Sequence, residues 1–166
     1  MEDEIDIRIR RVRERDLERI LEIEETAFPN PYPLGYLRFL AKTNPETFLV
    51  AEDDSALLGY IIADVRNKNE GHIISIAVSK GVRRKGVARA LIADVGRIFR
   101  DFFVEVVKLE VRVSNLSAIN LYRSMGYRHV GMMPGYYRDG EDAIIMALSM
   151  AREVHSSGEA RRGSIK

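Results

Sequence analysis

Three consecutive cations, Arg83, Arg84 and Lys85, precede Gly86 and Ala88 in the segment RRKGVA, where a helical pattern begins. The first backbone N–H groups of a helix have no partner within the helix, and the helix dipole adds partial positive charge there. Glycine and a small residue keep such a turn narrow, and the cations surround it with charge. The pattern favours a phosphate-binding turn, and a solvated basic turn before a surface helix is the equally weighted alternative.

Two familiar phosphate-binding motifs are absent from this segment. Gly81 and Gly86 have the spacing of a Walker loop, but Val87 stands where the lysine of that loop must be. The chain also contains no GxGxxG. An NTPase and a dinucleotide-dependent enzyme are therefore disfavoured.

The composition excludes several other kinds of site. The chain has no cysteine, so disulfides, thiolate nucleophiles and cysteine-based zinc sites are excluded. His72, His129 and His155 do not have the spacing of a known metal site, and we expect no metal. A net charge of +1 provides no general attraction to nucleic acid or membrane. The acidic N-terminus is unlike a signal peptide and no apolar run could span a membrane, so we expect a cytoplasmic protein.

The elements that position the basic turn alternate along the chain. Periodicity predicts strands at residues 5–12, 47–51, 56–65, 72–78, 104–113, 127–133 and 143–150. It predicts helices at residues 16–27 and 34–42, from residue 84 onward, and at residues 115–125, the last ended by Gly126 as a left-handed cap. The helix between strands 72–78 and 104–113 indicates a parallel crossover. We expect one domain over residues 1–150 and a flexible tail over residues 151–166.

Three segments together resemble a known superfamily: GHIISIAVSKGVRRKGVARALI, LEVRVSNLSAINLYRSMGY and GYYRDGEDAIIMAL. They resemble the GCN5-related N-acetyltransferase (GNAT) superfamily, and within it the protein N-terminal acetyltransferases of the bacterial ribosomal-protein alanine type and the archaeal catalytic-subunit type. The similarity extends from Ile7 to Met150. It implies an α/β (α+β) fold with a central mixed, mostly antiparallel seven-stranded sheet. That sheet is splayed between strands 4 and 5 and flanked by about four helices.

The resemblance implies acetyl-CoA as the cofactor. The family motif [QR]-x-x-G-x-[GA] binds its pyrophosphate, and its six positions are filled by Arg83, Arg84, Lys85, Gly86, Val87 and Ala88. The pantetheine arm is expected to lie in the splay and to pair with exposed backbone as an added strand does. The residues implied for this arm are Ile76, Ala77, Val78, Asn115 and Tyr122. For Asn115, a plain N-cap of the following helix is an equally plausible role from the residues alone.

The expected reaction needs a base. An α-amine has a pKa of about 8, so much of it is ammonium at neutral pH and must lose a proton before it attacks a thioester. The resemblance places Glu110 at the general-base position, with Leu109 and Val111 on the opposite face of its strand. It also aligns His72 with a catalytic tyrosine or histidine that could share or relay the proton. The alternatives are a solvated glutamate on a sheet face and a structural histidine.

The leaving thiolate needs a proton, and the developing oxyanion needs a donor. The resemblance makes Tyr122 the general acid, because a phenol with a pKa of about 10 can supply that proton. A tyrosine on a short amphipathic helix is otherwise usually a core residue. The backbone N–H of Val78 is the implied oxyanion donor. With no cysteine to carry an acyl group, we expect direct transfer.

The resemblance implies that two loops grip the N-terminus of a protein or peptide. They contribute Phe28, Pro29 and Tyr32 from AFPNPYP, and Tyr136 and Tyr137 from GYYRDG. As the alternative, each cluster only packs its own loop.

The preference for the first residue of the acceptor cannot be inferred from the archaeal type of enzyme. The LPENY loop of that type has an acidic residue where this chain has Asn30, and the loop here is more similar to the bacterial one. Two other functions stay open: acetylation of a lysine or small-molecule amine, and a noncatalytic CoA-binding or ribosome-associated module. In the last case Arg161, Arg162 and Lys166 could contact RNA, but so few cations give only weak binding. Ribosome or auxiliary-subunit association is possible, and we expect no membrane or specific nucleic-acid partner.

Overall fold

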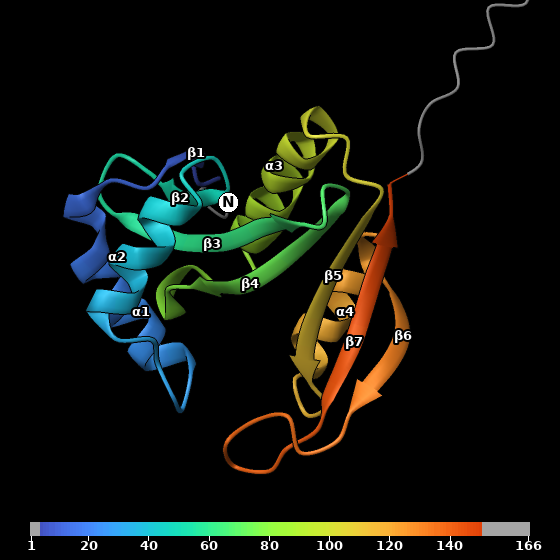
Figure 1. The fold of residues 1–166 in the computed structure, drawn as a ribbon. Coiled ribbons are helices and arrows are strands. Elements are labelled where there is room, and N and C mark those ends of the chain that lie inside the picture. Colours follow the sequence, from blue (N-terminus) through green and yellow to red (C-terminus); the bar gives the residue numbers. More distant parts are fainter. Residues whose placement is uncertain (1–3, 151–166) are drawn as a thin grey trace, which may run out of the picture.

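A computed structural model describes residues 4–150. Its seven strands form a single sheet in the order β1-β2-β3-β4-β5-β7-β6 (Figure 1). The strands are β1 (Arg8–Arg11), β2 (Phe48–Glu52), β3 (Leu57–Arg66), β4 (Glu70–Val78), β5 (Val106–Arg112), β6 (Arg128–Met133) and β7 (Ala143–Ser149). The helices are α1 (Leu17–Ala27), α2 (Leu34–Thr43), α3 (Val87–Asp101) and α4 (Leu116–Ser124), with 3-10 turns at η1 (Glu14–Asp16) and η2 (Lys80–Val82). The predicted tail, residues 151–166, lies outside the described residues.

The alternation of side chains along the strands divides the core between the two faces of the sheet. On β2, Phe48 and Val50 pack with α1 and α2, whereas Leu49 and Ala51 pack with α3. We call the first side of the sheet the α1 face and the second the α3 face. Each helix places an apolar stripe on the sheet, which is why the predicted helical periodicity is found in the structure.

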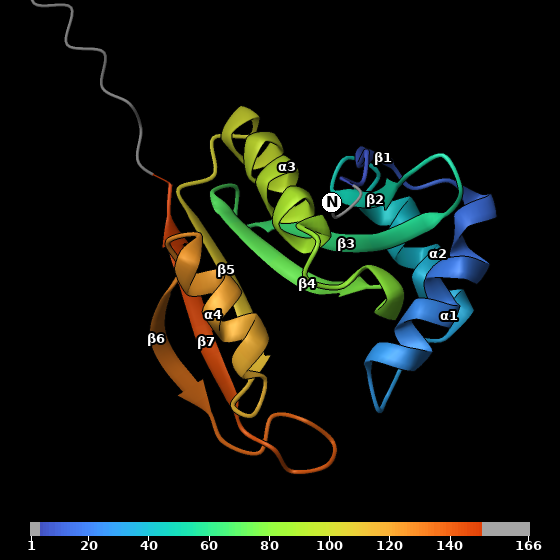
Figure 2. The same cartoon turned by 180° about the vertical axis from the view of Figure 1, so that it is seen from behind.

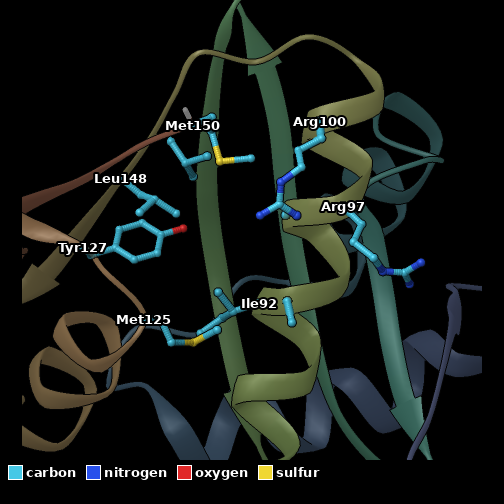
Figure 3. Close-up of a pocket in the computed structure, with 10 residues that line it drawn as sticks. Ile92, Arg97, Arg100, Met125, Tyr127, Leu148 and Met150 are labelled. Carbon is cyan, nitrogen blue, oxygen red and sulfur yellow. The ribbon is translucent and has the colours of Figure 1, made fainter. Parts of the chain in front are cut away.

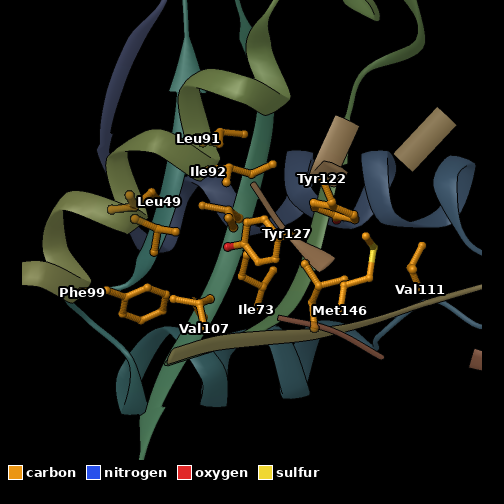
Figure 4. Packing of buried hydrophobic residues seen from close by; sticks show 14 of the residues in the cluster. Leu49, Ile73, Leu91, Ile92, Phe99, Val107, Val111, Tyr122, Tyr127 and Met146 are labelled. Carbon is orange, nitrogen blue, oxygen red and sulfur yellow. The ribbon is translucent and has the colours of Figure 1, made fainter. Parts of the chain in front are cut away.

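The α3 face contains the larger cluster of buried side chains. Leu91 and Phe99 of α3 pack over Ile73 and Val107, and Tyr122 of α4 joins the same cluster (Figure 4). In the reverse view α3 lies over β3 and β4, and α4 lies over β5 and β7 (Figure 2). The two helices therefore cover different halves of the sheet and approach its centre from either side.

The first strand is shorter than the sequence predicts. The pattern of residues 5–12 predicts a strand throughout, but only Arg8–Arg11 pair with β2. Beyond Glu52, Asp53 Oδ1 accepts hydrogen bonds from the backbone N–H groups of Ser55 and Ala56 and turns the chain away. Residues 5–7 thus have no strand to pair with.

The sheet is splayed between β4 and β5, as the resemblance implies. These strands pair in parallel only from Glu70 and Val106 to Ile73 and Leu109. The next residue, Ile74, is skipped in the β3–β4 register, since Ile62 pairs with Ser75 and Ala63 with Ile73. An extra residue of this kind bends a strand. From this bulge onward β4 follows β3, β5 follows β7, and the two strands diverge (Figure 1).

Candidate active site

The turn before α3 has the backbone conformation of a glycine-dependent helix start. Gly86 is the N-cap and has φ +85°, and Arg84 has φ +64°. A Cβ at Gly86 would meet no protein atom within 4 Å, so its φ, rather than crowding by the protein, is what requires glycine. The side chains of Arg84 and Lys85 are exposed and, among the described residues, have no ion-pair or hydrogen-bond partner. The turn thus offers free cations and free N–H groups to an anion.

The other motif positions divide between core and backbone roles. Val87 is buried in the core of the α3 face, so only its backbone can face a ligand. Arg83 does not extend freely, because its Nε donates to the carbonyl oxygen of Val78 at 3.3 Å. Ala88 is half-buried in the first turn of the helix.

Val78 presents its N–H to the opening between the strands. Ser79 donates its backbone N–H to the carbonyl oxygen of Leu58 in β3 at 2.8 Å. Successive N–H groups of an extended chain point to opposite edges, so the N–H of Val78 points away from β3. Ile76, Ala77 and Val78 are all beyond the last pair with β5. Their edge of β4 is therefore open to an extended ligand.

Asn115 precedes the first turn of α4 and Tyr122 lies in its last turn, on the helix that covers β5 and β7 (Figure 2). Tyr122 is 6% exposed, and its ring centroid is 5.7 Å from that of Tyr127. Burial, with smaller effects of Tyr127 and Tyr137, raises the pKa of Tyr122 above its ordinary value. Asn115 is the N-cap of α4, and its Oδ1 accepts the N–H of Ala118 at 3.2 Å. Asn115 therefore acts as the N-cap of the helix through its Oδ1, and its amide NH₂ remains available to a ligand.

His72 and Glu110 form a pair on the α1 face, where the splay begins. Nε2 of His72 lies 2.6 Å from Oε2 of Glu110, and the two side chains are 9% and 21% exposed. Leu109 and Val111 are buried on the opposite face, as the alternation predicts. Glu110 is thus not a freely solvated surface charge.

The charge state of Glu110 is set by opposing effects. Burial raises the pKa of its carboxyl group, but the hydrogen bond and charge of His72, with the charge of Arg66, outweigh it. The pKa of Glu110 is consequently lowered below its ordinary value. Glu110 is therefore a carboxylate at neutral pH, available to accept a proton.

Asp64 also faces His72, a contact that the sequence pattern does not predict. Oδ1 of Asp64 lies 3.8 Å from Nδ1 of His72, and Nε of Arg66 donates to Oδ2 of Asp64 at 3.2 Å. Asp64 stands in an otherwise aliphatic run, ADV within ALLGYIIADV, and an acidic residue inside an apolar strand is the signal that could have identified it.

The two predicted acceptor loops approach the Glu110 side of the opening. The rings of Tyr136 and Tyr137 are 5.0 Å apart, and the Arg112 guanidinium lies 4.0 Å from the Tyr137 ring centre. Burial raises the pKa of Tyr32 to about 12, and the nearby Glu24 carboxyl group adds to that rise.

The first of these loops rests on a buried carboxyl group that the sequence argument did not identify. Glu24 of α1 is 2% exposed and accepts the backbone N–H of Tyr32 at 3.0 Å. The Tyr60 hydroxyl also donates to Glu24 and lies 3.4 Å from the Ser75 Oγ. Burial raises the pKa of Glu24 to about 7, although the N–H of Tyr32 lowers it. Its spacing of four residues from Ile20, on the apolar stripe, could have revealed its burial.

The remaining acceptor residues of this loop differ in exposure. Phe28 is half-buried against the core of the α1 face, whereas Pro29 and Asn30 are exposed. The side chain of Phe28 is therefore fixed by packing, whereas those of Pro29 and Asn30 face solvent.

A hollow with other lining residues lies beside α3. Tyr127, Leu148 and Met150 face Ile92 and Arg100 across it (Figure 3). None of its lining residues is a predicted site residue. Within residues 4–150, no cluster of three or more His, Cys, Asp or Glu side chains could hold a metal ion, and no helix is long and apolar enough to cross a membrane.

Comparisons with known proteins agree with this geometry. Residues 17–127 match the acetyltransferase (GNAT) family. An N-alpha-acetyltransferase of Sulfurisphaera tokodaii is 36% identical over 155 residues, which cover 86% of this chain and 93% of the relative.

Two solved structures represent both types named by the sequence resemblance. Ard1 from Thermoplasma volcanium superimposes with a TM-score of 0.86 at 28% identity, covering 89% of this chain and 100% of that one. The ribosomal-protein-S18-alanine N-acetyltransferase from Escherichia coli superimposes with a TM-score of 0.75 at 32% identity, covering 89% and 97%. The predicted fold and resemblance are confirmed, and the chain belongs to the acetyltransferase (GNAT) family.

Proposed function

We propose that this acyltransferase moves an acetyl group from acetyl-CoA directly to the free α-amino group of protein N-termini. The observation that carries the proposal is the meeting of two half-sites at one opening. The basic turn and Tyr122 approach it from the α3 face, and His72 and Glu110 lie on the α1 face. A donor and an acceptor held on opposite faces can react through the splay without a covalent enzyme intermediate.

The chain offers matching groups to each part of the cofactor. Arg84, Lys85 and the N–H groups that follow Gly86 would bind the pyrophosphate. The open edge formed by residues 76–78 would pair with the pantetheine arm, and the Asn115 amide would be its side-chain donor. When bound, acetyl-CoA supplies the thioester carbonyl that the amine attacks.

The α1 face prepares the amine. The ammonium group loses a proton to the base pair, in which the Glu110 carboxylate is the acceptor and His72 its hydrogen-bonded partner. The neutral amine then forms the new N–C bond. The Val78 N–H, pointing into the opening, donates to the carbonyl oxygen as its charge develops.

Tyr122 completes the reaction on the α3 face. Burial keeps its hydroxyl protonated at neutral pH, so that a proton is in place when the C–S bond breaks and the sulfur leaves. Tyr122 donates this proton and recovers one from solvent. The protons balance, because an ammonium group that becomes an amide loses two, one to Glu110 before attack and one from the nitrogen as the C–S bond breaks. The leaving sulfur takes up one, and Glu110 releases the other to solvent.

The acceptor class follows from the relatives and the loops. N-alpha-acetyltransferases are among the relatives, and two pairs of aromatic rings, Tyr32 with Tyr36 and Tyr136 with Tyr137, support a peptide as the acceptor. In this proposal Phe28, Pro29 and Tyr32 contact the peptide from one loop, and Tyr136 and Tyr137 contact it from the other. We assign this activity to one domain over residues 1–150, acting in the cytoplasm on newly exposed protein N-termini.

Acetyl transfer to matched peptides tests the proposal. Radiolabelled acetyl-CoA is offered with short peptides of varied first residue, each paired with an N-terminally blocked version that contains lysine. We expect label on the free N-termini only, with a ranking that defines the preference left open by Asn30. Label on the blocked peptides would move the activity to lysine. Tight acetyl-CoA binding without label on any peptide would contradict a protein acceptor.

A further inference from the structure

A line of charged side chains crosses three strands at the narrow end of the opening. Asp64 on β3 is the register partner of His72 on β4, and Arg66 holds the outer oxygen of Asp64. Oδ1 of Asp64 lies 3.8 Å from Nδ1 of His72, whose Nε2 lies 2.6 Å from Glu110 on β5. The imidazole is thus placed between two carboxyl groups.

The facing atoms of Asp64 and His72 lack a hydrogen-bond partner. Among the described residues, three buried polar side-chain atoms have none, and two of them are Oδ1 of Asp64 and Nδ1 of His72. An unprotonated Nδ1 would direct its lone pair at a carboxylate oxygen inside the protein, which is unfavourable. A proton on Nδ1 converts the same contact into an attraction between N–H and carboxylate.

The contact between His72 and Glu110 also indicates that the imidazole ring carries a proton on both nitrogens. At 2.6 Å, a hydrogen must lie between Nε2 of His72 and Oε2 of Glu110. A glutamate is ordinarily a carboxylate at neutral pH, so the hydrogen is carried by the ring. An imidazolium satisfies both neighbours, whereas a neutral ring satisfies only one.

We propose that Asp64 is a positioning residue that holds a proton on Nδ1 of His72, so that Nε2 donates to Glu110 and Glu110 alone accepts the proton of the amine. The inference rests on the proposed function, because it divides the work of the base pair. A ring protonated on both nitrogens cannot take up another proton. His72 therefore orients and stabilises the Glu110 carboxylate rather than acting as the base.

Nitrogen NMR of the imidazole, on the full chain at pH 7, tests the contact independently of activity. The signals of His72 are assigned by their loss in a His72→Gln variant, since the chain has three histidines. We expect a proton on both nitrogens in the unmodified protein and loss of the Nδ1 proton in Asp64→Asn. An unprotonated Nδ1 in the unmodified protein overturns the inference without any variant. So does an Nδ1 proton that is retained in Asp64→Asn.

Glu70→Gln is the matched control. Its side chain is 26% exposed against 25% for Asp64, it lies on the next strand, and it contacts Lys108 at 3.4 Å. The variant removes one negative charge without touching His72. We expect the ring signals of the unmodified protein. Loss of the Nδ1 proton in this control would show that net charge, and not the Asp64 contact, determines the state of the ring.

Kinetics then separate the inference from the proposed function. Asp64→Asn should lower kcat roughly tenfold at unchanged KM for acetyl-CoA, as for residues coupled in one network. In a His72→Gln background the same change should have no further effect, because Asp64 acts through His72. Independent, multiplying losses would overturn the inference. If the ring signals behave as expected but no peptide is acetylated even by the unmodified protein, the proposed function fails and the Asp64 contact stands.

Discussion

The proposed sites on the α3 face and the α1 face are formed by different kinds of group, backbone groups on the first and side chains on the second. On the α3 face, the proposed cofactor site uses backbone geometry: the left-handed Gly86, the free N–H groups after it and the open edge at Val78. On the α1 face, the proposed acceptor site uses side chains from different elements, among them the buried Glu24 and the half-buried Glu110. A backbone site can be contained in a few consecutive residues. A site of buried side chains exists only once the sheet has formed.

This difference predicts different responses to mutation. A change on the α3 face should weaken cofactor binding and leave the acceptor KM unchanged. A change on the α1 face should alter proton transfer or acceptor binding and leave the affinity for acetyl-CoA unchanged. The distinction between the two faces would be contradicted if every substitution weakened the binding of acetyl-CoA and of the acceptor equally.

Glu110→Gln should have the largest effect. The amide cannot accept the proton of the amine, so we expect kcat to fall by about 100-fold or more. Calorimetric titration should show unchanged affinity for acetyl-CoA. Glu70→Gln, which neutralises a carboxylate of similar exposure on the neighbouring strand, should retain normal kcat. A Glu110→Gln enzyme with nearly normal turnover would remove Glu110 from the mechanism.

Gly86→Ala should have the largest effect on the α3 face. An L side chain at φ +85° costs roughly 1–2 kcal/mol, so the turn relaxes and acetyl-CoA binds about tenfold more weakly. The KM for the peptide should not change. Gly96→Ala is the matched control, because Gly96 lies in the middle of α3 with no atom within 4 Å of the added carbon. That variant should bind normally and be stabilised by about 0.5–1 kcal/mol.

Glu24→Ala should affect the acceptor loop. Without the carboxylate, the N–H of Tyr32 loses its partner, a loss of about 1 kcal/mol, so the KM for peptide should rise about fivefold. Glu24→Gln retains an oxygen acceptor and should restore most of the affinity. Exposed Glu25→Ala on the same helix should behave as the unmodified chain. An equal rise in the KM for acetyl-CoA would indicate general damage rather than loss of loop positioning.

The smallest expected effect is a pH dependence of stability that arises from Glu24. Its pKa is about 7 in the folded protein, above the ordinary value of 4.5, so the folded state holds its proton more tightly than the unfolded state. The resulting stability is complete below about pH 4.5 and is lost as the pH rises through 7. Between pH 5 and pH 8, Tm of the unmodified chain should fall by about 2–4 °C relative to Glu24→Gln. Parallel melting curves would contradict the raised pKa.

The sequence predicts the α3 face better than the α1 face for a physical reason. The sequence RRKGVA places cations, a glycine and a helix start next to each other, so one local segment predicts the turn observed at Gly86. His72 and Glu110 are 38 residues apart and meet only because β4 and β5 pair in parallel. Their pairing came from family resemblance, not from spacing.

Asp64 and Glu24 were missed because their roles depend on register and burial. Asp64 faces His72 through the pairing of β3 with β4, which no local pattern encodes. Glu24 looks like one of several charges on an amphipathic helix until the loop folds over it. The strand of residues 5–12 was predicted too long, because its pattern does not reveal where the partner strand ends.

A conjugate that joins CoA through an acetyl bridge to the α-amine of a peptide tests the central claim most directly. If cofactor and acceptor meet through the splay, its dissociation constant should be at least about 100-fold lower than that of CoA alone, because both half-sites are filled by one molecule. A conjugate linked through a lysine side chain of the same peptide should bind no better than CoA. Equal affinity of both conjugates and CoA would contradict an acceptor site for α-amines opposite the cofactor.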